Sequence, residues 1–172
     1  LPDDVYATEY LLQPLPAGSL VFPPDRTHWV DVHPGRHVVW VGVDPAGEGA
    51  DALMRVLALD AVTNSQNVGM IVRSVVAAGF DGLLWPMKGQ PWVNGLVVRA
   101  AAGAIFECPI ALCETLSAGL ALLQGAGFSS FGLDAGASQS LFDLVPPHRV
   151  LFVLGSESQG LSPEVETQLD GR

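Results

Sequence analysis

The stretch Val56-Leu-Ala-Leu-Asp-Ala-Val62, followed after a polar turn by Asn67-Val-Gly-Met-Ile-Val-Arg73, decides the fold class of this 172-residue chain. The first run is short and apolar, as in a buried strand, and the second has the apolar spacing of a helix. We expect the helix to span about residues 68–78, with Asn67 as its N-cap and Gly79 as its C-terminal glycine. The stretch therefore predicts a strand, a turn and a helix in close succession.

The same alternation repeats along the rest of the chain. We expect further strands at residues 82–87, 105–112, 128–133 and 150–154, and helices at residues 96–102 and 116–125. Pro109 interrupts the second of these strands. Strands that alternate with helices of about ten residues form right-handed crossovers. The sequence thus predicts an α/β fold, a parallel sheet with helices on both faces.

The first 54 residues have a different character. Seven prolines divide this segment into short pieces, within which residues 38–43 are typical of a strand and residues 44–51 of a linker. We therefore expect two parts, residues 1–54 and residues 55–172. Because the chain begins with Leu1 and has no basic, apolar leader, we also expect a trimmed N-terminus.

Composition limits the classes of function. Hydrophobic residues make up 49% of the chain, yet no run approaches the roughly 20 apolar residues of a membrane span, so we expect no membrane segment. Cys108 and Cys113 lack a surrounding ligand cluster, which favours reduced thiols, no metal site and a cytoplasmic location. The net charge of −10, with Lys88 as the single lysine, argues against a generic nucleic-acid-binding surface. A few placed arginines could still hold one ribose-phosphate.

A second polar stretch, Gly155-Ser-Glu157-Ser-Gln-Gly160-Leu161, follows the last predicted strand. We expect Gly155 and Gly160 to permit positive φ angles and close approach of a ligand to the backbone. Pro163 then occupies the first position of a short helix. Ligands of parallel sheets bind beyond the carboxyl ends of the strands, and both polar stretches are predicted to lie at that edge.

Each stretch also has a purely structural interpretation. Asn67 could merely cap its helix and Arg73 could merely reach the surface, although the apolar residues around Arg73 favour a partner or a ligand. The glycine-rich stretch could be a connection without a ligand, since a lone glycine loop is a weak signal. We expect Asp60 to shape the mouth of the site by hydrogen bonding. Trp85 and Trp92 could either pack in the core or stack on a nucleobase.

Taken together and in order, the two stretches resemble the first two signature motifs of the SpoU/TrmH methyltransferases. The resemblance extends over about residues 56–170 and includes the Gly79-Phe-Asp81 turn and the Arg99-to-Ala104 helix. It implies a SPOUT-type fold with a trefoil knot, an exception to the usual absence of knots, and a homodimer. It also implies methylation of the ribose 2′-hydroxyl of RNA with S-adenosylmethionine as cofactor.

The resemblance also assigns roles to individual residues. Arg73, Asn67 and Glu157 would form the catalytic set, with Asn67 and Arg73 facing the RNA and Glu157 organising the loop. The cofactor would be held by Gly132, Leu133, Gly155, Ser156, Gly160 and Leu161. A guanidinium rarely gives up a proton, so we expect Arg73 to grip the adjacent phosphate and stabilise developing alkoxide charge rather than act as a base.

Two departures from the family pattern bear on function. The third family motif, with Ser-Leu-Asn, does not occur before Arg172, so we expect an incomplete knot and weak cofactor binding in this chain. The turn at residues 33–37 resembles the end of a family N-terminal substrate-binding domain, which favours ribosomal over transfer RNA. A non-catalytic RNA-binding or assembly protein on the same fold, and a Rossmann-like domain for another nucleotide, remain alternatives.

Overall fold

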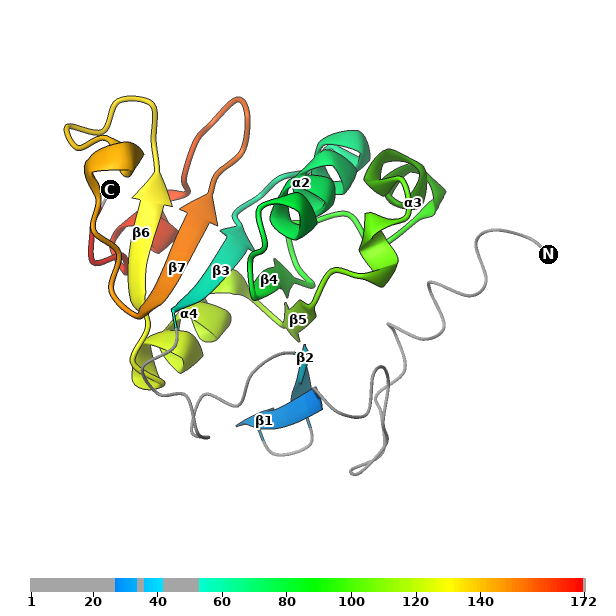
Figure 1. The fold of residues 1–172 in the computed structure, drawn as a ribbon, viewed down its shortest axis with the longest axis horizontal. Coiled ribbons are helices and arrows are strands. Elements are labelled where there is room, and N and C mark those ends of the chain that lie inside the picture. The colour runs from blue at the N-terminus through cyan, green and yellow to red at the C-terminus, as the bar shows by residue number, and fades with distance from the viewer. Residues whose placement is uncertain (1–26, 34–35, 42–52, 172) are drawn as a thin grey trace.

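A computed structural model of the chain describes residues 27–33, 36–41 and 53–171. Its centre is a five-stranded sheet in the order β5-β4-β3-β7-β6, in which all paired strands are parallel (Figure 1). The strands are β3 (Met54–Leu59), β4 (Gly82–Pro86), β5 (Ile110–Cys113), β6 (Ser129–Leu133) and β7 (Arg149–Leu154). The predicted α/β class with a parallel sheet is confirmed.

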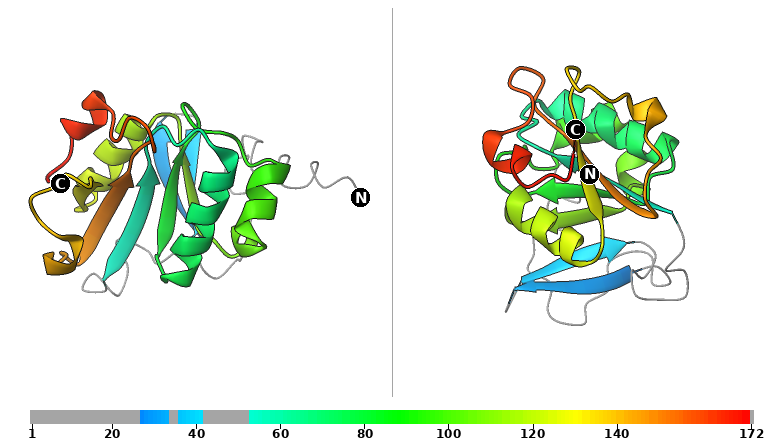
Figure 2. Two further views of the ribbon diagram at one scale, coloured as in Figure 1. Left: turned by 90° about the horizontal axis from the view of Figure 1, so that it is seen from above. Right: turned by 90° about the vertical axis from the view of Figure 1, so that its left-hand side faces the viewer.

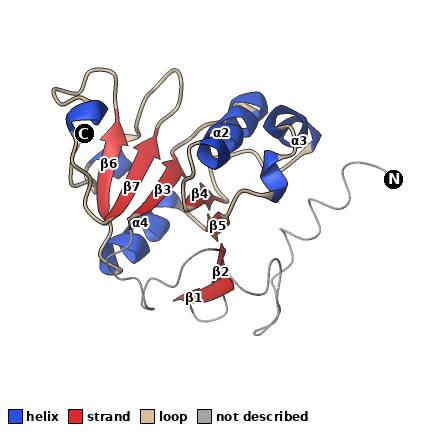
Figure 3. Ribbon diagram, viewed as in Figure 1, coloured by secondary structure: helices blue, strands red, loops and turns tan. Residues whose placement is uncertain are grey.

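Helices cover both faces of this sheet (Figures 2 and 3). One face carries α2 (Ser65–Ala77) and α3 (Gly95–Ala101), and the other carries α4 (Leu116–Gly125) and the short α5 (Pro163–Glu166). Two 3-10 turns, η1 (Ala104–Phe106) and η2 (Leu141–Asp143), lie in the connections. Among the described residues, no helix is long and apolar enough to cross a bilayer.

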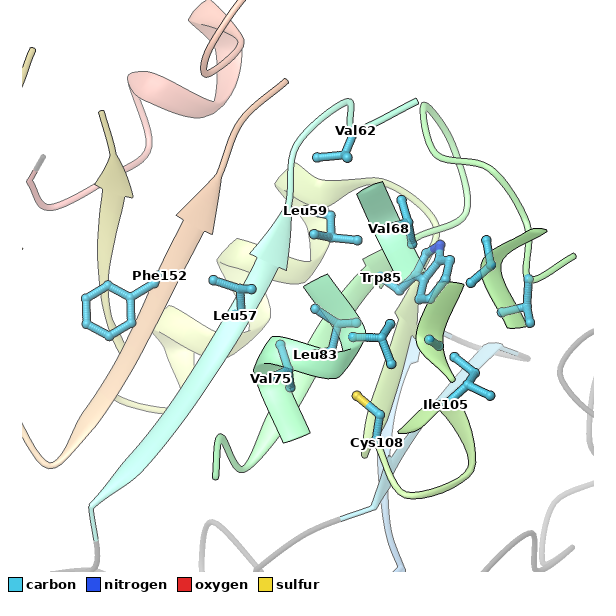
Figure 4. Close-up of a cluster of buried hydrophobic side chains, with 14 of the residues drawn as sticks. Leu57, Leu59, Val62, Val68, Val75, Leu83, Trp85, Ile105, Cys108 and Phe152 are labelled. Carbon is cyan, nitrogen blue, oxygen red and sulfur yellow. The ribbon is translucent and has the colours of Figure 1, made fainter. Parts of the chain in front are cut away.

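Alternation along the strands divides the core into two layers. Val56 and Ala58 of β3 point to the α4 side, where they pack with Leu120 and with alternate residues of β7. Leu57 and Leu59 point to the opposite side and pack with the buried valines of α2 and α3 (Figure 4). Fully burying a valine or leucine contributes roughly 1.5–3 kcal/mol, so both layers are needed to hold a sheet that is buried on both faces.

The N-terminus of α2 differs from the prediction. Its N-cap is Asn64 rather than Asn67, because Oδ1 of Asn64 accepts hydrogen bonds from the backbone N–H groups of Gln66 (2.9 Å) and Asn67 (3.4 Å). The helix therefore starts earlier than expected, and the Asn67 side chain is not used as a cap. The other end agrees with the sequence, since Gly79 has a φ of 64° in the turn that closes the helix.

Two further elements correct the sequence analysis. Residues 105–109 form η1 and a turn instead of the first half of a strand, and β5 begins only after Pro109, which lacks the N–H needed in a ladder. An antiparallel hairpin of β1 (Thr27–His33) and β2 (Arg36–Val41) precedes the sheet, of which only the second strand was predicted. The proposed linker at residues 44–51 lies outside the described residues.

Candidate functional site

The strand order creates an opening at the carboxyl edge of the sheet. From β3 the chain runs through β4 to β5 on one side, whereas β7 and β6 lie on the other side. The connection that leaves β3 and the loop that leaves β7 therefore diverge between two adjacent strands. Such a switch point is where open parallel sheets bind ligands, and both polar stretches of the sequence lie there.

Strand register places the two stretches level with each other. Leu59, Leu154 and Leu133 are paired across β3, β7 and β6, so that all three strands end in one row. The residues that follow them, including Asp60 and Gly155, form the rim of the opening. Leu133 and Leu154 are half-buried there and offer partly exposed apolar surface to the rim.

Residues 155–161 form a closed loop. The backbone N–H of Ser156 donates to the carbonyl oxygen of Gly160, and the N–H of Gly160 donates back to Ser156, both at 2.9 Å. Gly160 has the predicted positive φ, 69°. Gly155 does not, and its need for glycine has another origin: a Cβ there would lie 2.3 Å from the carbonyl carbon of Gly160. The loop folds onto its own backbone, and that contact, rather than a ligand, requires the glycine.

The two stretches touch through their side chains. Nδ2 of Asn67, freed from capping, donates a hydrogen bond of 2.5 Å to Oε1 of Glu157 at the tip of the loop. Ninety positions separate these residues in the sequence. The structure thus brings together two of the three residues predicted to form the catalytic set.

The third predicted residue, Arg73, lies on the exposed side of α2. The residues around Arg73 are nearly all apolar in type, but the helix is not buried on every side, because its buried residues are confined to Val68, Gly69, Val72 and Val75. Within the described part of the chain, no hydrogen bond or ion pair to Arg73 is present. Its guanidinium is therefore free for a ligand from outside.

Gly69 fixes how closely α2 and α3 pack. A Cβ at this position would lie 2.6 Å from the carbonyl oxygen of Val97 and 2.5 Å from Cβ of Ala100. The two N-termini are also joined, since Asn94 donates to Oγ of Ser65 at 3.1 Å. The close approach at Gly69 is thus made by α3, and it sets the position of the helix that carries Asn67 and Arg73.

Other expected site residues divide between the core and the surface. Trp85 is 2% exposed and belongs to the core, whereas Trp92 is 44% exposed near the rim. The N–H of Gly132 is already bonded to the carbonyl oxygen of Gly171, at 2.9 Å.

Burial raises the pKa values of Cys108 and Cys113 to about 12, so both thiols stay neutral. Among the described residues, no group of three or more His, Cys, Asp or Glu side chains could hold a metal.

Sequence reasoning missed two residues that hold the C-terminal segment to the sheet. Ser162, the N-cap position of α5, donates from its backbone N–H and its hydroxyl to Asp60. Asp170 accepts from the backbone N–H and the hydroxyl of the buried Ser130, which fixes the last described residues against β6. The serine before Pro163 was a local signal for a helix start, but its partner lies 102 positions away.

Comparisons with known proteins agree with this architecture. The model of the SpoU rRNA Methylase family matches residues 54–172. A protein of Mycobacterium sp. (strain KMS) named as an uncharacterized tRNA/rRNA methyltransferase is 37% identical over 123 residues, covering 72% of this chain and 38% of that protein. The chain thus spans little more than a third of the length of such relatives.

Two solved structures extend the comparison. A TrmH-family protein from Porphyromonas gingivalis is 29% identical, with a TM-score of 0.61 over 73% of this chain and 51% of that one. An rRNA methyltransferase from Sinorhizobium meliloti, solved with S-adenosylmethionine bound, is 25% identical, with a TM-score of 0.63 over 75% and 48%.

Proposed function

Because this chain belongs to the SpoU rRNA methylase family, we propose that it is part of an S-adenosylmethionine-dependent RNA methyltransferase that modifies a ribose 2′-hydroxyl. Ribosomal RNA is the proposed substrate, and a cytoplasmic homodimer with a family-type knot is the proposed form of the whole protein. The observation that carries the proposal is the contact of Asn67 with Glu157 at the switch point. It unites the two family motifs in one site.

The residues at the rim fit the cofactor. Leu133 and Leu161 are half-buried and can cover the faces of an adenine, while the closed loop from Gly155 through Ser156 to Gly160, whose Ser156 and Gly160 backbone groups bond to each other, would form the wall beside the methionine part and the ribose. Gly132 lies behind Leu133 and supports the end of β6. When bound, the cofactor supplies an electrophilic methyl group on a sulfonium. The chain supplies a site of matching shape beside the aligned ends of β3, β7 and β6.

Positioning is the main task of the protein in such a transfer. The attacking oxygen must lie in line with the methyl group, and well-oriented reactants gain several orders of magnitude in rate. We assign Asn67 and Glu157 to the alignment of the ribose, since their mutual hydrogen bond fixes both at the mouth. Asn67 and Glu157 would hold the 2′-hydroxyl in line with the methyl group that the bound cofactor would supply, and the hydroxyl proton would pass to solvent.

Arg73 is assigned to the phosphate beside the reacting ribose. Its exposed guanidinium is suited to charge-assisted hydrogen bonds with phosphate oxygens. As the 2′-oxygen loses its proton, a fixed positive charge nearby stabilises the developing negative charge. Because the guanidinium stays protonated at neutral pH, this assignment gives Arg73 an electrostatic role only.

A non-catalytic RNA-binding or assembly role is the second candidate, favoured by charge. The chain carries 18 acidic and 8 basic residues. Of the described cations, Arg55 and Arg149 bond to backbone carbonyls and Lys88 pairs with Glu114. Few of the described cations are thus free for phosphates, which suits a role in assembly better than one that needs strong RNA binding by this chain.

A methyl-transfer assay separates these functions. Purified intact protein is incubated with unmodified ribosomal or transfer RNA and S-adenosylmethionine labelled in its methyl group. The proposal expects incorporated label that survives alkaline hydrolysis as a dinucleotide, because a 2′-O-methyl group blocks cleavage of the adjacent bond. Binding of RNA without incorporation would support the second candidate, and label on a base would contradict ribose methylation.

A further inference from the structure

Asp60 is an unusual residue within the part of the chain that the structure describes. Its side chain is 6% exposed, and among the described residues it is the buried one with an ionisable, acidic side chain. No salt bridge to it is present among the described residues. A buried carboxylate without a cation must be compensated by hydrogen bonds, so its partners show what it does.

Those partners belong to the end of the cofactor loop. Oδ2 of Asp60 accepts the backbone N–H of Ser162 at 2.6 Å, and Oδ1 accepts the Ser162 hydroxyl at 3.2 Å. The backbone N–H of Asp60 in turn donates to the carbonyl oxygen of Leu154 at 2.9 Å, directly before the loop. Asp60, which directly follows β3, therefore holds both the residue before loop 155–161 and the residue after it.

The helix that follows cannot fix the exit without this help. α5 has only four residues, and Ser162 makes no side-chain capping bond to it because its hydroxyl is turned to Asp60. Helices this short gain little stability from their own hydrogen bonds. The exit of the loop depends instead on the two charge-assisted bonds to Asp60.

We infer that Asp60 is a positioning residue of the cofactor site, which holds loop 155–161 in the shape that receives S-adenosylmethionine through its two hydrogen bonds to Ser162. The inference rests on the proposed function. Asp60 acts through Ser162 and does not itself touch the cofactor or the RNA. Its loss therefore weakens cofactor binding more than it slows methyl transfer at saturating cofactor.

The test compares four variants of the intact protein. Asp60→Asn keeps the size but removes the negative charge and leaves a single oxygen, so that only one of the two bonds from Ser162 can still be accepted, and Ser162→Ala removes only the hydroxyl bond. Calorimetry should show a Kd for S-adenosylmethionine about 10-fold higher for Asp60→Asn and about 3-fold higher for Ser162→Ala. Ser162→Thr retains the hydroxyl and should bind as wild type. Asp143→Asn, which removes an exposed carboxylate elsewhere, should also leave the Kd unchanged.

Two further measurements separate positioning from general destabilisation. In Asp60→Asn the KM for cofactor should rise, while kcat should stay within about 2-fold of the wild-type value. Adding Ser162→Ala to Asp60→Asn should raise the KM little further, because both substitutions disrupt the same interaction. Hydrogen exchange should increase in peptides covering residues 155–166 and not in those covering β3 or α4. Unchanged Kd and loop exchange in Asp60→Asn, or a uniform increase in exchange, would overturn the inference.

Failure of the proposed function gives a different result. If wild-type protein binds no S-adenosylmethionine, methyl transfer by this chain is contradicted while the exchange measurement still decides whether Asp60 orders the loop. If wild type binds cofactor and Asp60→Asn binds it equally well, the proposed function stands and the role of Asp60 falls.

Discussion

The charged residues at the two edges of the central sheet differ in the partners that they bind. At the amino edge, Arg55 donates to the carbonyl oxygen of Gly79 and lies over the Phe80 ring, and Arg149 donates to the carbonyl oxygen of Ala126. Each arginine closes the C-terminal end of a helix, where cations are favoured by the helix dipole. At the carboxyl edge, by contrast, the acidic side chains of Glu157 and Asp60 bond to Asn67 and Ser162, and the exposed Arg73 of α2 has no such partner among the described residues.

Residues that support the fold and residues that serve the site thus lie at different edges of the sheet. The arginines at the amino edge bond to backbone carbonyl oxygens, so their substitution should lower the free energy of unfolding. Polar residues at the carboxyl edge either fix the two loops or face outward, so their loss should be felt in binding and turnover. The following substitutions test this division, beginning with the largest expected effect.

Arg73→Ala should abolish methyl transfer, reducing kcat by about 100-fold to 1,000-fold, as expected for removal of a group that stabilises charge in the transition state. The Kd for S-adenosylmethionine should stay within a few-fold. Radiolabel incorporation and calorimetry measure the two quantities. Arg99→Ala serves as control because Arg99 is an exposed arginine of the neighbouring helix α3. Normal turnover in Arg73→Ala would remove Arg73 from the site.

Gly155→Ala should raise the Kd for S-adenosylmethionine by about 100-fold or more, because the added Cβ would overlap the Gly160 backbone and open the loop. Gly125→Ala is the matched control, since a Cβ at that position in α4 meets nothing within 4 Å. The control should bind normally. Equal affinities of the two variants would show that the closed loop is not needed for binding.

Asn67→Ala and Glu157→Ala should each reduce kcat/KM by about 10-fold, as for loss of one charge-assisted hydrogen bond. The double variant should lose much less than the product of the single effects, since both residues share one contact. Steady-state kinetics on the four proteins measures the coupling. Fully multiplicative effects would mean that the two side chains act independently.

Arg55→Ala should lower the free energy of unfolding by about 1–2 kcal/mol, through loss of the bond to Gly79 and the stacking on Phe80. Denaturant titration measures this change. The Kd for S-adenosylmethionine should remain that of wild type at temperatures where the variant is folded. A specific loss of cofactor affinity would break the distinction between the edges.

The two buried thiols in the interior between the edges should make the stability of the fold depend on pH in the alkaline range. Folding raises the pKa of Cys108 and Cys113 from 9.0 to about 12, so the native state holds protons that the unfolded state releases. Their contribution to stability is therefore complete below pH 9 and declines as the pH rises toward 12. Unfolding titrations at pH 8 and pH 10 should show the decline, and Cys113→Ala should reduce it. A rise in stability over this range would contradict the burial of the thiols.

Much of the architecture was predicted from local signals alone. Helix α4 was predicted with its observed bounds, and the strand ends of β4 and β7 differ from prediction by one residue. These elements have strong apolar periodicity and clear turn residues at their ends. The errors fell where local signals compete: Asn64 and Asn67 are both suitable caps, and residues 105–108 are mostly apolar without forming a strand.

The sequence by itself determined the elements, their order, the family resemblance and the two stretches that lie at the site. Only the tertiary structure decided that β7 lies between β3 and β6, that Asn67 meets Glu157, and that Asp60 holds Ser162. Periodicity and capping act over a few residues, so the chain displays them locally. Pairings across 90 or 102 positions depend on how strands are ordered and aligned in register, and only the assembled sheet fixes that geometry.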